Sequence, residues 1–328
     1  MDLASLIAVI ATALLFDFTN GFHDTANMVA TSISTRAMSP RLAVVLTSLL
    51  NFAGAFISIK VAATVGAGIV DTRLVTEQVV FAGLLGAIIW NLITWYFGLP
   101  SSSSHALIGG LVGAMLAAVG MHGVIFNAVI FKVIIPAIVA VVIAFGAAGV
   151  VILCLYIVFG KFKSRTVTRG FRMGQIPASV LLSIAHGTND AQKTMGVIAL
   201  SLVAYGSISP LHFYVPWWVI AVSAASLGLG TYIGGWRIIK TMGSKIIKMD
   251  PVQGFTAQGV GSLVILISSA LGYPLSTTHV MSSSIMGAGA AKRLSAVRWG
   301  VAKNIVIAWI LTLPCAAVVS AAAYELVR

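Results

Sequence analysis

Long apolar runs alternate with short polar or basic loops along the whole chain. Because about 20 apolar residues cross a bilayer as a helix, these runs predict membrane elements rather than a soluble core. In the first half they cover residues 3–34, 40–66, 78–98, 100–120 and 128–160. In the second half they cover residues 175–206, 214–235, 255–272, 274–290 and 297–326.

The two halves share one order of elements, which predicts an internal repeat. Residues 78–120 and 255–290 each consist of two short runs joined at a proline, which indicates a helical hairpin. Three crossings plus one hairpin per half make the halves inverted relative to each other, an architecture typical of secondary transporters. The predicted fold is an all-α polytopic membrane protein with two inverted repeats of about five elements, residues 1–160 and 175–328, joined by a basic cytoplasmic linker at 161–174.

Composition and charge agree with a membrane protein. Of the 328 residues 59% are hydrophobic and 9% are charged, whereas a soluble domain carries about 25% charged residues. The net charge of +12 comes from basic residues in short loops, as the positive-inside rule predicts, so nucleic acid is excluded as a partner. The same rule predicts that both termini lie outside. We expect this multi-pass protein in the plasma (cell inner) membrane. The oligomeric state stays open, with a homodimer among the alternatives.

A polar string interrupts the first apolar run of each half. Gly21–Asn27 contains a carboxylate and an amide, and Gly187–Lys193 repeats this composition. Polar groups at membrane depth usually mark a solute pathway, and we expect the helices to break at Asn20-Gly21 and His186-Gly187. Carboxylate and amide oxygens at such breaks suit sodium, although a proton is the alternative. The predicted cation ligands are Asp24, Asn27, Asn189 and Asp190.

A second polar string lies at each predicted hairpin tip. Pro100–His105 and Pro274–His279 both combine a proline, hydroxyl side chains and a histidine. Proline suits the start of a helix, and a helix start presents free N–H groups that bind phosphate and similar anions. The predicted oxyanion ligands are Asp24, Thr25, Ser102, Ser103, Ser104, Asn189, Asp190, Gln192, Thr277 and Thr278. A carboxylate accepts a hydrogen bond from a protonated oxyanion, which favours phosphate over sulfate.

Other polar residues are assigned supporting roles. Lys193 either balances the charge of Asp190 or contacts the anion, and Asp17 either caps a broken helix or lines the cation route. His105 and His279 are expected to hydrogen-bond across the tips, with Ser276 beside them. For His23 and His186, a structural role is favoured over a role in titration.

With these duplicated strings and hairpins, the chain resembles the PiT family of inorganic phosphate transporters over essentially its whole length. The resemblance implies cation-coupled phosphate symport, driven by sodium or protons, with alternating access around a midplane site. It implies no cofactor besides the co-transported ion. Alternatives are a sulfate permease of the same fold and an anion channel. An enzyme is not expected, because the sequence has no Gly-X-Ser-X-Gly or His-Glu-X-X-His motif.

Overall fold

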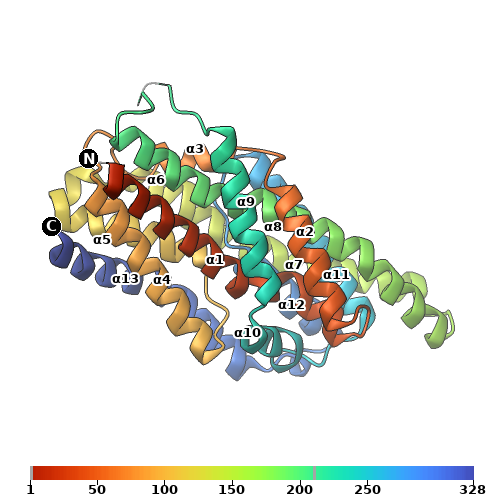
Figure 1. The fold of residues 1–328 in the computed structure, drawn as a ribbon. Coiled ribbons are helices and arrows are strands. Elements are labelled where there is room, and N and C mark those ends of the chain that lie inside the picture. The colour runs from red at the N-terminus through yellow and green to blue at the C-terminus, as the bar shows by residue number, and fades with distance from the viewer. Residues whose placement is uncertain (1–2, 210–211) are drawn as a thin grey trace.

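A computed structural model describes residues 3–209 and 212–328, and every regular element in these ranges is a helix (Figure 1). The longer helices are α1 (Leu3–Ser34), α4 (Glu77–Phe97), α5 (Ser103–Val119), α7 (Ile135–Phe159), α8 (Ser164–Ala204), α9 (Trp217–Ile233), α11 (Pro251–Ala270), α12 (Thr277–Lys292) and α13 (Trp299–Val327). The shorter ones are α2 (Pro40–Gly54), α3 (Lys60–Ala67), α6 (Phe126–Ala128) and α10 (Trp236–Lys240). Short π-helical segments, Val129–Ile134 and Thr241–Lys245, continue α6 into α7 and extend α10.

Helix length and hydropathy confirm a polytopic membrane protein. Among the described residues, 6 helices are long and apolar enough to cross a bilayer. A seventh candidate is α9 together with the helical segment 236–245, which bends away from it by 58°. Helix α8 contains buried Asp190 and Lys193 and a basic amino-terminal end, which lowers its mean hydropathy without moving it out of the bundle.

The helices pack in a pattern that occurs twice with the halves exchanged. The α4–α5 hairpin packs against α13, and the α11–α12 hairpin packs against α7. Helix α1 packs against α4 and α9, as α8 packs against α11 and α2. The start of α1 and the end of α13 lie at one end of the bundle, whereas the α7–α8 connection lies at the opposite end (Figure 1). Each hairpin is therefore packed against a long helix of the other half.

The predicted breaks in the first helix of each half are wrong, because α1 and α8 continue through Gly21 and Gly187. These glycines serve close helix packing. A Cβ atom on Gly21 would lie 2.4 Å from the carbonyl oxygen of Leu227 in α9, and one on Gly187 would lie 2.3 Å from that of Asn51 in α2. Since the carbonyls stay within the helical ladder, cation ligands at this level have to come from side chains.

Two further boundaries differ from the prediction. The run at 40–66 is divided into α2 and α3, and the expected linker at 161–174 is mostly the first part of α8. Val167 and Phe171 are four residues apart, and both pack on a small apolar cluster that includes Ile152. This i, i+4 spacing places both on one face of a helix, and that face packs against α7. The start of α8 and the end of α7 extend together beyond the bundle (Figure 1).

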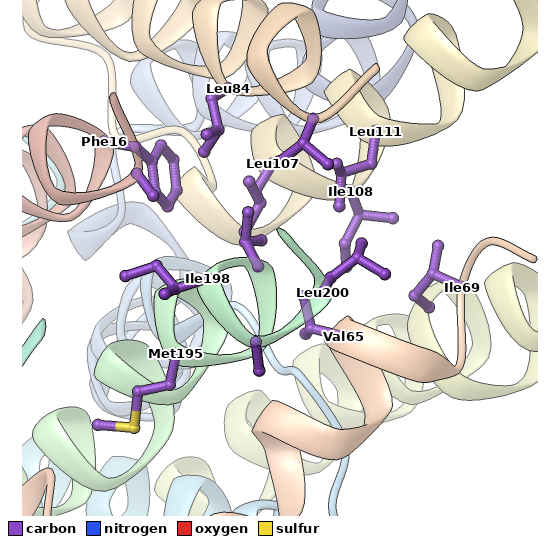
Figure 2. Close-up of a cluster of buried hydrophobic side chains, with 14 of the residues drawn as sticks. Phe16, Val65, Ile69, Leu84, Leu107, Ile108, Leu111, Met195, Ile198 and Leu200 are labelled. Carbon is purple, nitrogen blue, oxygen red and sulfur yellow. The ribbon is translucent and has the colours of Figure 1, made fainter. Parts of the chain in front are cut away.

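Apolar packing fixes the first hairpin against α8. Figure 2 shows Phe16 of α1, Leu84 of α4 and Leu107 of α5 gathered around Ile198 of α8, and all four side chains are buried. Because interiors are close-packed and resist small shifts, this cluster holds the start of α5 beside the polar part of α8.

Candidate functional site

The two hairpin tips are built in the same way. Gly98 ends α4 and Gly272 follows α11, both with positive φ, at 64° and 79°, a conformation that glycine adopts without steric cost. Ser102 then caps α5 by accepting a hydrogen bond from the His105 N–H at 3.1 Å, and Ser276 caps α12 through the His279 N–H at 3.2 Å. The prediction that proline begins these helices is wrong, because Pro100 and Pro274 lie two residues before the capping serines. A serine hydroxyl can accept a hydrogen bond from the first turn of the helix, which a proline cannot do.

The tips converge, as predicted. The Ser104 hydroxyl donates a hydrogen bond to the carbonyl oxygen of Leu275 at 3.1 Å. The imidazole rings of His105 and His279 lie edge to face with 4.8 Å between centroids, and His279 also stacks on Trp309 at 4.3 Å. The histidines thus contact each other through their rings rather than through the expected hydrogen bond.

Each tip presents the first turn of a helix to the other. The first intrahelical donor of α5 is Ala106, and that of α12 is Val280, so the preceding amides belong to no helical ladder. These amides carry the partial positive charge of a helix start and favour an anion. The buried Ser103 hydroxyl has no hydrogen-bond partner among the described residues and adds a further donor.

The polar string of α1 faces the second hairpin tip. The Asp24 carboxylate lies 3.3 Å from the Thr278 hydroxyl and 3.4 Å from that of Thr277. The Asn27 amide donates to Thr278 at 2.9 Å, and its carbonyl oxygen Oδ1 has no partner among the described residues. On its other side, Asp24 lies 2.7 Å from Nδ1 of His23.

The polar string of α8 reaches both tips. Asp190 forms an ion pair with Lys193 and lies 3.0 Å from Nε2 of His186. The Thr277 hydroxyl is 3.4 Å from Asp190 and therefore bridges the carboxylates of the two strings. The Asn189 amide donates to Ser269 at 2.8 Å, and its buried Oδ1 has no partner in the described part of the chain.

The site is closed to solvent and rich in oxygen ligands. Asp24, Asp190 and Lys193 are only 2%, 0% and 1% exposed. Ligand atoms of Asp24, His186 and Asp190 all lie within 4.8 Å of one another, close enough for one ion to bridge them. Carboxylate and amide oxygens are the ligands that hard cations prefer.

Two predicted ligands point elsewhere. The Thr25 hydroxyl donates to Gly21 O at 2.7 Å and to Thr231 O at 3.2 Å. The Gln192 carbonyl accepts from the N–H of Val61 at 2.7 Å and so caps α3. In an unbroken helix, residues three or four apart share a face and immediate neighbours do not, which explains why these two side chains leave the site.

Asp17, for which the sequence left two roles open, lies in the interior of the bundle. Its carboxylate is fully buried without a hydrogen-bond partner among the described residues, and Asn20 and Thr194 lie beside it. It does not cap a broken helix, since α1 is continuous there. His23 and His186 were expected to be structural residues, but each lies next to a carboxylate of the site. Their positions one residue before Asp24 and four residues before Asp190 could have indicated this.

A buried oxyanion- and cation-suited site between two hairpins of a helical membrane protein defines a membrane transport protein. The chain matches the phosphate transporter family over residues 20–320, and it belongs to that family. This membership confirms the resemblance stated from the sequence and the prediction that the chain is a transporter rather than an enzyme.

Individual relatives agree. The chain is 51% identical over 328 residues to a probable low-affinity inorganic phosphate transporter of Mycobacterium tuberculosis, covering 100% of this chain and 79% of the relative. It is 44% identical over 320 residues to a protein of the same description from Bacillus subtilis, covering 97% and 96%. A solved structure described as the sodium-dependent phosphate transporter superimposes with a TM-score of 0.91 at 26% identity, covering 99% of each chain.

Proposed function

We propose that the protein is a secondary active transporter that carries inorganic phosphate across the plasma membrane together with sodium. The observation that carries this proposal is the meeting of two helix starts with two carboxylate-bearing helices in one buried site. The solved relative described as sodium-dependent supports sodium as the coupling ion.

Phosphate is assigned to the space between the tips. Its oxygens accept hydrogen bonds from the first-turn amides of α5 and α12 and from the hydroxyls of Ser103, Ser104, Thr277 and Thr278. A protonated phosphate oxygen donates to Asp24 or Asp190. Sulfate has no proton at neutral pH and would face these carboxylates without a hydrogen bond, so phosphate is the preferred anion.

Sodium is assigned to the oxygens left over in the two strings. Asp24 supplies a carboxylate, and the unpartnered Oδ1 atoms of Asn27 and Asn189 supply neutral oxygens, while Asp190 faces the same space. Asp17 lines the route of the cation along α1. These groups also suit a proton, which makes the driving ion a matter for direct measurement.

Transport proceeds by alternating access around this site. The exchanged packing of residues 1–160 and 175–328 supports two inverted repeats, and the basic loops assign both termini to the outside. The contact of Ser104 with Leu275 and of His105 with His279 closes the site, and separation of the hairpins from opposite sides opens it. A permanently open pore would not bury its ligands in this way, which favours a carrier over an anion channel.

The test is uptake of radiolabelled phosphate into proteoliposomes of the purified protein, with imposed sodium or pH gradients. An inward sodium gradient is expected to drive accumulation, and excess sulfate is expected to leave it largely unchanged. Accumulation that follows only the pH gradient would reject sodium as the driving ion. Equal competition by sulfate would reject the assigned substrate, and non-saturating anion current would support a channel.

A further inference from the structure

The two polar strings have the same length and share their first and fourth residues, and among the five positions that differ the last one exchanges a neutral amide for an ammonium. Gly21–Asn27 and Gly187–Lys193 each place an aspartate at the fourth position. At the seventh position the first string has Asn27 and the second has Lys193. Because α1 and α8 are continuous helices, each of these residues lies one turn beyond its aspartate on the same face.

Asn27 and Lys193 make related contacts with opposite hairpins. The Asn27 amide donates to the Thr278 hydroxyl at the second tip. Lys193 donates to the hydroxyl of Ser104, which occupies the same place in the first tip. The repeat of this contact shows that the two side chains occupy corresponding positions in the two halves.

The Lys193 ammonium is surrounded by oxygens. It contacts the Asp190 carboxylate, the Ser104 hydroxyl and, at 3.0 Å, the carbonyl oxygen of Leu275. An ammonium has three hydrogens to donate, and these three acceptors use them all while the two tips are in contact. Carboxylate, hydroxyl and backbone carbonyl oxygens are also what a bound sodium ion would require.

We propose that Lys193 is a tethered cation that takes the place of one of two related sodium ions, so that one sodium site remains, at Asp24 and Asn27. The inference rests on the proposed sodium coupling. Asp24 and Asp190 contribute two negative charges, and the ammonium cancels one of them. A chain with asparagine at both seventh positions would carry one more uncompensated charge and would bind one more sodium ion.

The experiment measures the ratio of transported ²²Na⁺ to ³²P-phosphate in proteoliposomes for the wild type, K193N, K193R and K60N. K193N is expected to raise the ratio by one sodium per phosphate, and K193R is expected to keep the wild-type ratio. Lys60 is a matched control, because it also donates to a carbonyl of the second hairpin, Ala270 O at 3.0 Å, but outside the site. An active K193N with an unchanged ratio would overturn the inference.

A binding measurement covers variants that fold but do not transport. The melting temperature in detergent is compared in NaCl and in choline chloride, without phosphate. K193N is expected to gain a larger sodium-dependent stabilisation than the wild type, and an equal response would overturn the inference. If K193N does not fold, N27K provides the reciprocal case and is expected to lose the sodium dependence that the wild type has; a retained dependence would contradict the proposal.

The two proposals fail separately. A wild type driven only by a pH gradient would contradict sodium coupling. In that case, a sodium-dependent stabilisation that is larger in K193N than in the wild type would still support the tethered cation, and an equal response in the two proteins would contradict it.

Discussion

Replacement of Asp24 by asparagine is the most informative perturbation of the coupling site. The substitution keeps the shape of the side chain and removes one buried charge, which no lysine or arginine balances in the described structure. For unit charges about 4 Å apart at an effective dielectric constant of about 20, the interaction is worth about 4 kcal/mol. The loss of that attraction corresponds to roughly a 1,000-fold weaker affinity for sodium.

The assay measures sodium binding to the purified D24N protein by isothermal titration calorimetry in a choline buffer. Sodium-driven phosphate uptake in proteoliposomes is expected to disappear in parallel. Asp71 provides the matched control, because it lies in an exposed loop and pairs with Arg73 at 2.7 Å, so D71N is expected to bind sodium normally. A well-folded D24N with a sodium affinity within a few fold of the wild type would refute the assignment of this carboxylate.

Three further substitutions test separate parts of the structure. G187A places a Cβ atom 2.3 Å from a carbonyl oxygen of α2 and is expected to lose the folded protein in size-exclusion chromatography, whereas G146A, with open space around it, is expected to be neutral. S103A removes one hydrogen bond to a charged anion, worth about 1.5 kcal/mol, and is expected to weaken phosphate binding about tenfold without changing sodium binding; equal phosphate affinity would exclude that hydroxyl. D190N leaves the Lys193 ammonium buried without its partner, which costs about 3–5 kcal/mol, and is expected to lower the melting temperature more than the double variant D190N/K193M does.

The membrane class and the hairpin tips were predictable from the sequence because they depend on local patterns. Long apolar runs identify membrane helices, and the repeated Gly-X-Pro strings at Gly98 and Gly272 mark a helix end followed by a helix start. The convergence of the tips followed from their duplication. The helix ends and starts at each tip involve residues that are close together in the chain, whereas the convergence joins distant segments, and the structure confirms both.

The continuity of α1 and α8 and the orientations of several ligands were not predictable, because they depend on packing between distant segments. Gly21 and Gly187 are the same residue type that interrupts helices, but here each admits the backbone of a crossing helix. Once the helices are continuous, the rotation per residue decides which side chains enter the site. That rotation sends Thr25 to α9 and Gln192 to α3 and brings Lys193 to the tips.

The central claim is that phosphate binds between the first turns of α5 and α12, beside Asp24 and Asp190. A cryo-electron microscopy map of the protein in phosphate and sodium tests it most directly. The account predicts tetrahedral density within hydrogen-bond distance of the amides of Ser103, Ser104, Thr277 and Thr278, with the two tips moved apart to admit it. Phosphate resolved elsewhere in the protein, while Ser104 remains bonded to Leu275, would contradict it.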